Sequence, residues 1–399
     1  MLEFINRIKL TPFLFLAPAI WMTTGMLWDG DGDMRLVPIV LIVAAISIAL
    51  FRFEVIKDNF KNSFWIKLLL INSLFGVMAY EFYGFDSREL RATLIIFFLL
   101  IATPKIFYTK NTMQWLLFVA SVSCCTYSYY YQIHVSLARG YWPINAIPFA
   151  TICGLIGTSC LGLIFSNFKE KRVALLIIST VLVWASLLLS QSRGPLIAMI
   201  VVTSVLLLYI SYKKNKFLSL CVLLGLIVAT LGVSNLPVIK GRIHNTVQEF
   251  YLIQNGDYSS SLGFRLQMFR VGSELWKKKP ILGYGKEVKS EFNRLEEEGI
   301  ITSQMNWLIS MTFHNGYLDK FVLYGVLGGG IFLVFIFYPI SISRKYSIEN
   351  GTILLWAPAF FISICNLSDA PFINAQVTIY YMYTIGIVIM MLSNEKERE

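Results

Sequence analysis

Three side chains, two beside long apolar blocks and one in the long connection between such blocks, have the types and positions to perform chemistry. Arg193 lies in a short Ser-Arg-Gly-Pro connection between two apolar blocks, Arg265 follows a Gly-Phe pair, and His314 precedes Asn315 where an apolar block begins. An arginine side chain stays protonated and binds phosphate through two parallel hydrogen bonds. A neutral imidazole can accept a proton near neutral pH. The set predicts arginines that neutralise a lipid-linked diphosphate and a histidine that deprotonates an attacking hydroxyl group.

Each of these residues also has an ordinary structural interpretation. Arg193 could extend toward lipid headgroups, and Arg265 could do the same at the edge of the bilayer. A single histidine at the membrane interface is structural more often than catalytic. A neutral imidazole that acts as a base needs a partner for its second nitrogen, and we expect Asp369, in the last outer loop, to be that partner.

The sequence offers little to a metal ion. The run Asp29-Gly30-Asp31-Gly32-Asp33 resembles the start of a calcium-binding loop, but Met34 stands where that loop needs glycine and Val40 where it needs glutamate. We interpret the run as a solvated turn. The six cysteines all lie in apolar blocks without the paired spacing of a zinc site. We therefore predict neither a metal nor another cofactor.

The elements that position these residues follow from composition. Of 399 residues, 56% are hydrophobic and only 15% are charged, whereas soluble domains have about 25% charged residues. The apolar residues form blocks long enough to cross a bilayer, which needs roughly 20 residues. The chain is therefore predicted to be an all-α integral membrane protein. Twelve spans are expected, at residues 10–28, 35–51, 64–83, 91–108, 114–132, 146–167, 173–190, 195–212, 217–237, 315–340, 352–368 and 375–392.

The basic residues predict the orientation of the chain in the membrane. The net charge of +10 would suggest nucleic acid in a soluble protein, but here it indicates topology, and no nucleic-acid partner is expected. Seventeen Lys and Arg residues lie in one set of alternate short connections and five in the other. The positive-inside rule places the richer set, with both termini, in the cytoplasm. The organisation is then nine spans in 1–237, an outer loop in 238–314, and three spans with a cytoplasmic tail in 315–399.

The outer loop is predicted to contain an amphipathic helix. Phe264, Met268, Val271 and Leu275 recur at helical spacing, and Trp276 with three lysines follows them. Such a helix lies in the membrane interface or packs on the rest of the protein as a lid. Both interpretations stay open from the sequence.

The order of the motifs resembles the O-antigen ligase/polymerase superfamily. The motifs are Ser192-Arg193-Gly194, then Gly263-Phe264-Arg265 with Trp276, Pro280, Gly283 and Gly285, and finally His314-Asn315 with Leu318. The length, the twelve spans and the large outer loop resemble the lipopolysaccharide O-antigen ligases of Gram-negative bacteria. The resemblance implies a fold akin to the integral-membrane GT-C transferases and an inner-membrane location with the active site facing the periplasm.

The same resemblance implies an inverting, metal-independent glycosyltransferase. Its donor would be O-antigen polysaccharide on undecaprenyl diphosphate, and its acceptor a sugar hydroxyl of lipid A–core. Arg193 and Arg265 would bind the diphosphate, and His314 would be the base. One alternative is an O-antigen polymerase, which passes the donor to another lipid-linked glycan. Another is a flippase for lipid-linked oligosaccharides, which the scarcity of charges within the spans disfavours.

Overall fold

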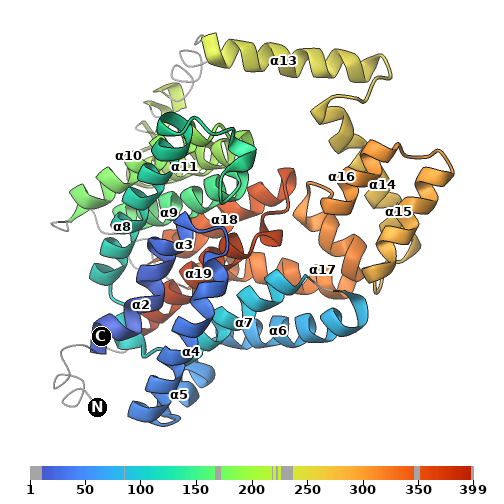
Figure 1. Cartoon of the computed structure of the whole chain (residues 1–399). Coiled ribbons are helices and arrows are strands. Elements are labelled where there is room, and N and C mark those ends of the chain that lie inside the picture. Colours follow the sequence, from blue (N-terminus) through green and yellow to red (C-terminus); the bar gives the residue numbers. More distant parts are fainter. Residues whose placement is uncertain are drawn as a thin grey trace. The chain divides into compact units, whose positions relative to one another are not determined.

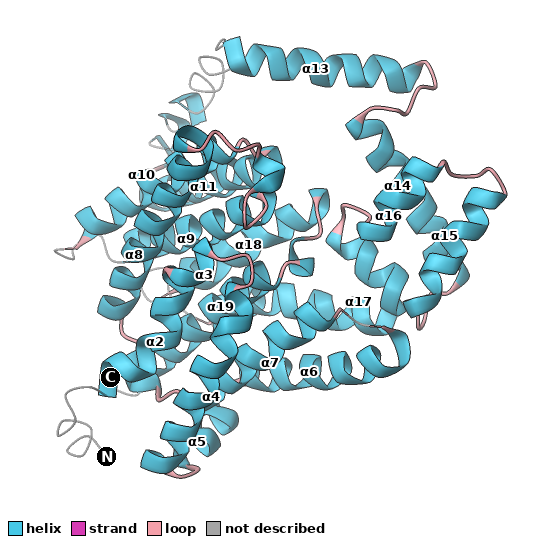
Figure 2. Ribbon diagram, viewed as in Figure 1, coloured by secondary structure: helices cyan, strands magenta, loops and turns pink. Residues whose placement is uncertain are grey.

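The computed structural model describes residues 11–84, 86–166, 172–217, 219–221, 223–225, 237–345 and 351–396. These residues form helices and connecting loops, without a β-strand (Figure 2). Seven of the helices are long and apolar enough to cross a membrane, and two shorter apolar stretches, Pro12–Trp28 and Thr352–Ser368, accompany them. The predicted all-α membrane class is confirmed. The chain divides into two compact units: residues 1–199, 333–365 and 371–399 form the first unit, and residues 200–332 and 366–370 form the second.

Eleven of the twelve predicted spans overlap helices in the described residues, and most of 217–237 lies outside them. The first unit contains α2 (Thr11–Thr23), α3 (Gly25–Trp28), α4 (Gly32–Phe51), α5 (Glu54–Asn62), α6 (Phe64–Tyr83), α7 (Ser87–Ala102), α8 (Lys110–Tyr129), α9 (Ala146–Ser166), α10 (Val173–Ser190) and α19 (Ala375–Lys396). The helix predicted at 91–108 instead ends at Ala102, because the residue before Pro104 is driven out of the helical region.

Two helices form the centre of the first unit. Within their most apolar windows, 89% of α9 and 94% of α19 is buried inside the protein. Helix α9 packs against α8, α10 and α19. Both helices are apolar all round, which is the pattern of a helix enclosed by other helices. Gly154 lets α9 approach a neighbour closely, because a Cβ at that position would lie 2.0 Å from the Phe361 ring.

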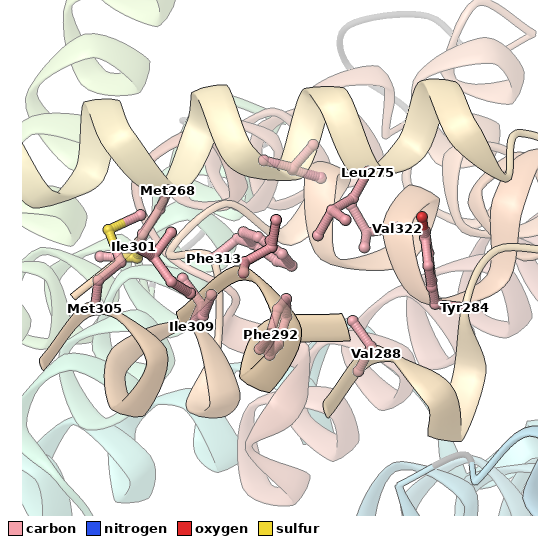
Figure 3. Close-up of a cluster of buried hydrophobic side chains, with 12 residues drawn as sticks. Met268, Leu275, Tyr284, Val288, Phe292, Ile301, Met305, Ile309, Phe313 and Val322 are labelled. Carbon is pink, nitrogen blue, oxygen red and sulfur yellow. The ribbon is translucent and has the colours of Figure 1, made fainter. Parts of the chain in front are cut away.

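The second unit includes α13 (Pro237–Gln254), α14 (Ser261–Lys278), α15 (Val288–Glu297) and α16 (Ser303–Met311) (Figure 1). Helix α14 begins where the Ser260 hydroxyl accepts a hydrogen bond from the Gly263 N–H, as an N-cap residue does. Its predicted apolar stripe is present. Met268 and Leu275 are buried, and they point toward side chains of α15 and α16 (Figure 3). The stripe therefore packs on neighbouring helices of the same unit.

The long helix α17 (Gly316–Ser343) is interrupted at Gly325, where φ is 60° and ψ is −158°. Its two segments pack on each other: the Tyr317 and Phe332 rings lie 5.8 Å apart, which a straight helix could not allow for residues fifteen positions apart. The sequence predicted a continuous span at 315–340. A Cβ at Gly325 would lie 2.1 Å from the Ile281 carbonyl oxygen, so this position requires glycine.

The segment that follows α14 satisfies the backbone at this interruption. The Tyr284 N–H donates to the Val322 carbonyl at 2.9 Å, and the Val326 N–H donates to the Pro280 carbonyl at 2.8 Å. Non-helical backbone at membrane depth is tolerated only where protein or a watery cavity satisfies its polar groups. The loop between α14 and α15 therefore supports the broken helix that begins just after His314.

Candidate active site

His314 lies in the short turn between α16 and α17. Its φ is +50°, which is the left-handed region that residues with a Cβ rarely adopt. Asn315 then starts α17, because its side-chain oxygen accepts a hydrogen bond from the Leu318 N–H at 3.0 Å. The motif His314-Asn315 is thus a helix start that presents the histidine immediately before the first turn.

The structure brings His314 and Asp369 together. Nδ1 of His314 lies 3.2 Å from Oδ1 of Asp369, and the two side chains are 27% and 22% exposed. The backbone reinforces this contact, since the Gly316 N–H donates to the Asp369 carbonyl at 2.9 Å. With a proton on Nδ1, the ring donates to the carboxylate and leaves Nε2 free to accept another proton. This is the geometry of an oriented general base.

The approach of these two segments depends on Gly316. A Cβ there would lie 2.0 Å from the side-chain oxygen of Asn366, near the end of α18 (Thr352–Ser368). A side chain at position 316 would displace the Asn366 side chain where the start of α17 meets the segment that carries Asp369. The sequence Asn315-Gly316 therefore combines a helix cap with a close backbone approach.

A buried carboxylate that the sequence analysis missed lies behind the turn. Asp319, in the first turns of α17, is 5% exposed and accepts hydrogen bonds from the Thr312 hydroxyl at 2.6 Å and the Phe313 N–H at 2.9 Å. An aspartate in an apolar helix at the edge of the membrane was the available signal, because such residues are costly and seldom without a role.

Arg265 occupies the face of α14 that packs toward the histidine turn. It lies seven residues, or two helical turns, before Gly272, about 10 Å along the helix axis. A Cβ at Gly272 would lie 2.6 Å from the Leu318 side chain and 3.0 Å from the Phe313 ring. The Arg265 side chain is half-buried, and it forms no ion pair with any residue that the structure describes. It is a cation available to an anionic ligand.

The lysines at the end of α14 differ from Arg265 because they have acidic partners. Lys277 pairs with Glu274 at 2.7 Å, Lys278 lies 3.6 Å from Glu291, and Lys279 pairs with Glu287. The hydrogen bond to Glu287 raises the pKa of the Lys279 amine. These contacts neutralise the basic end of the helix.

Glu291, on α15, has a second cationic neighbour. Hydrogen bonds from Arg294 lower the pKa of its carboxyl group below the usual range. The Glu291 carboxylate therefore forms ion pairs with both Lys278 of α14 and Arg294 of α15.

Arg193 belongs to the first unit, where it begins α11 (Arg193–Lys214). The preceding Ser192 hydroxyl donates to the Ala146 carbonyl at 3.0 Å and so ties the α10–α11 connection to the start of α9. The Arg193 side chain is exposed, and no ion pair joins it to a carboxylate in the described parts of the chain. Its local surroundings leave the guanidinium group open to solvent or a ligand.

Two aspartates of the 29–33 run form ion pairs within the protein, so the run is not simply the solvated turn that the sequence suggested. Asp33 is buried and pairs with Arg91 at 2.6 Å, and Gln376 donates to the Gly30 carbonyl at 2.8 Å. Asp29 pairs with Arg35 at 2.9 Å. No group of three or more His, Cys, Asp or Glu side chains comes together among the described residues. The run therefore links α4 to α7 and α19 in this structure.

Two comparisons with known proteins agree with one another. A family model described as O-antigen ligase matches residues 178–333, which include Arg193, Arg265 and His314. The chain is also 23% identical over 344 residues to the O-antigen ligase of Escherichia coli strain K12, with 79% of this chain and 80% of that protein covered. These findings confirm the resemblance to the O-antigen ligase superfamily. They support an enzyme of the O-antigen ligase/polymerase type in a bacterial membrane.

Proposed function

From this similarity, we propose that the protein is an inverting, metal-independent glycosyltransferase. It moves O-antigen polysaccharide from undecaprenyl diphosphate to a sugar hydroxyl of lipid A–core. The observation that carries the proposal is the contact between His314 Nδ1 and Asp369 Oδ1 at 3.2 Å. This contact supplies an oriented base at the start of an apolar helix. In the proposed topology, the start of that helix lies at the depth of the headgroup of a lipid-linked substrate.

The reaction needs one proton acceptor and one site for negative charge. Nε2 of His314 takes the proton of the acceptor hydroxyl as its oxygen forms a bond to the anomeric carbon of the donor sugar. The bond from that carbon to the diphosphate oxygen breaks on the opposite side, which inverts the anomeric configuration. The diphosphate leaves with the bonding electrons. Asp369 stabilises the imidazolium that forms.

Arginine supplies the charge that the leaving diphosphate requires. Arg265 is half-buried and has no acidic partner among the residues described, which supports its assignment to the diphosphate. Its planar side chain can bind two phosphate oxygens at once. Arg193 is assigned to the same ligand on the basis of the sequence resemblance. Positive charge aimed at a developing anion is commonly a large contribution to catalysis.

The proposed orientation places both termini in the cytoplasm and the 238–314 segment in the periplasm of a Gram-negative cell. The distribution of lysine and arginine supports it. Reporter fusions within 238–314 are expected to be active as periplasmic proteins, and fusions after residue 396 as cytoplasmic ones. The reverse pattern would place His314 on the wrong side of the membrane for the proposed substrates.

The activity is tested with purified protein, lipid-linked O-antigen and lipid A–core. Polysaccharide should appear on lipid A–core in the presence of EDTA, and His314→Ala should abolish its formation. A longer lipid-linked chain without modified lipid A–core would identify a polymerase instead. Activity that disappears with EDTA and returns with magnesium or manganese would contradict the metal-independent mechanism.

A further inference from the structure

We infer that Asp319 is a positioning residue that holds His314 in its working conformation. The inference rests on the proposed role of His314 as the base. Asp319 acts on the turn that carries the histidine, whereas Asp369 contacts the imidazole itself. The two carboxylates therefore have separate tasks: one fixes the backbone and the other orients the ring.

The contacts of Asp319 all serve this turn. Oδ2 accepts a hydrogen bond from the Thr312 hydroxyl at 2.6 Å, and Oδ1 accepts one from the Phe313 N–H at 2.9 Å. The Thr312 oxygen in turn accepts a hydrogen bond from the His314 N–H at 3.1 Å. One carboxylate thus fixes three consecutive residues, directly or through the threonine hydroxyl.

The backbone of His314 requires such support. Its φ of +50° is unfavourable for a residue with a Cβ and persists only where the surroundings determine it. A change of this dihedral would move Cβ and the imidazole away from Asp369. The hydrogen bonds around Thr312 oppose that change.

The chemistry of the network explains why a carboxylate is suited to position 319. Both groups that face it, a hydroxyl and an N–H, donate hydrogen bonds, and a carboxylate accepts through both oxygens. Because Thr312 gives its only hydroxyl proton to Asp319, its oxygen is directed to accept from His314. An asparagine would present an N–H₂ group to one of the two donors and leave a buried polar group unsatisfied.

Two substitutions test the network from its two ends. Asp319→Asn and Thr312→Val should each lower kcat about 10-fold to 100-fold, with the KM for the lipid-linked donor changed less than threefold. Thr312→Ser keeps the hydroxyl and should retain at least half of the wild-type kcat. The matched control is Thr302→Val, which removes the same hydroxyl from a helix cap at the other end of α16, where it accepts from the Met305 N–H at 3.2 Å. This control should leave kcat within about twofold of wild type, because exposed caps affect stability and not the histidine.

The outcomes separate this inference from the proposed function. If His314→Ala is inactive but Asp319→Asn and Thr312→Val keep wild-type kcat, Asp319 does not position the base and the proposed function stands. If His314→Ala is active, the proposed base itself is wrong. A rise in donor KM without a fall in kcat would make Asp319 part of substrate binding and overturn the inference. Should Asp319→Asn fail to accumulate in the membrane, the Thr312 pair decides the question, since both variants keep the carboxylate.

Discussion

Replacement of Asp369 by asparagine tests the catalytic pair most directly. The amide oxygen can still accept the hydrogen bond from Nδ1 of His314, so the ring keeps a partner at the observed 3.2 Å. The negative charge is lost. The variant therefore separates orientation of the ring, which should survive, from stabilisation of the imidazolium that forms as the acceptor hydroxyl loses its proton.

The size of the effect follows from the geometry. Two unit charges about 4 Å apart interact by about 4 kcal/mol at an effective dielectric constant of 20. The side chains are 27% and 22% exposed, so solvent screens part of this energy. We expect a loss of about 2–4 kcal/mol from the transition state, which corresponds to a fall of about 30-fold to 1,000-fold in kcat.

The assay measures initial rates of polysaccharide transfer over a range of donor concentrations. The donor KM should change little, because the arginines bind the diphosphate in the proposed mechanism. The matched control is Asp257→Asn, in the same unit. The Asp257 carboxylate accepts a hydrogen bond from the Ser259 N–H at 2.9 Å, and an asparagine oxygen can accept the same bond. An unchanged kcat in the single variant would refute the ion-pair reasoning.

Three further predictions concern charge and backbone. Arg265→Lys should lose most transfer because lysine cannot make the bidentate contact, whereas Arg270→Lys, an exposed residue of the same helix, should retain it in the same assay. Asp33→Ala should lower stability by about 3 kcal/mol by leaving Arg91 without its carboxylate, yet the folded enzyme should transfer sugar in EDTA; a need for added metal would contradict this. Gly325→Ala should lower the thermal unfolding midpoint strongly, because it adds a Cβ at positive φ beside a carbonyl oxygen, while Gly330→Ala has open space and should be nearly neutral.

The sequence determined the helical framework. Apolar blocks of about 20 residues can be satisfied in a bilayer only as helices, so their positions appear in the composition without knowledge of their neighbours. The amphipathic helix at 261–278 could also be predicted from the sequence alone, because its apolar residues recur at the period of a helix. The residue types at 265 and 314 also predicted anion binding and proton transfer, and these assignments stay predictions.

Contacts between distant parts of the chain determined the rest. The apolar sequence around Gly325 predicts a continuous span. The interruption there depends on hydrogen bonds with residues 280–284, about 40 positions away in the chain. Three lysines follow Trp276 in the sequence, and the carboxylates that neutralise Lys278 and Lys279 come from α15 and from the turn before it.

The arrangement around His314 shows the same division. Asp369 was named from the chemistry that an imidazole base requires, and only the folded chain places its carboxylate 3.2 Å from the ring across 55 residues. The sequence signals Asp319 only as a carboxylate in an apolar block, and it does not indicate which groups that carboxylate contacts. Its importance arises from a left-handed backbone at residue 314 and from two donors that converge on one buried carboxylate. Hydrophobic periodicity reports which face of a helix is apolar, whereas the meeting of polar groups depends on how the packed helices close around them.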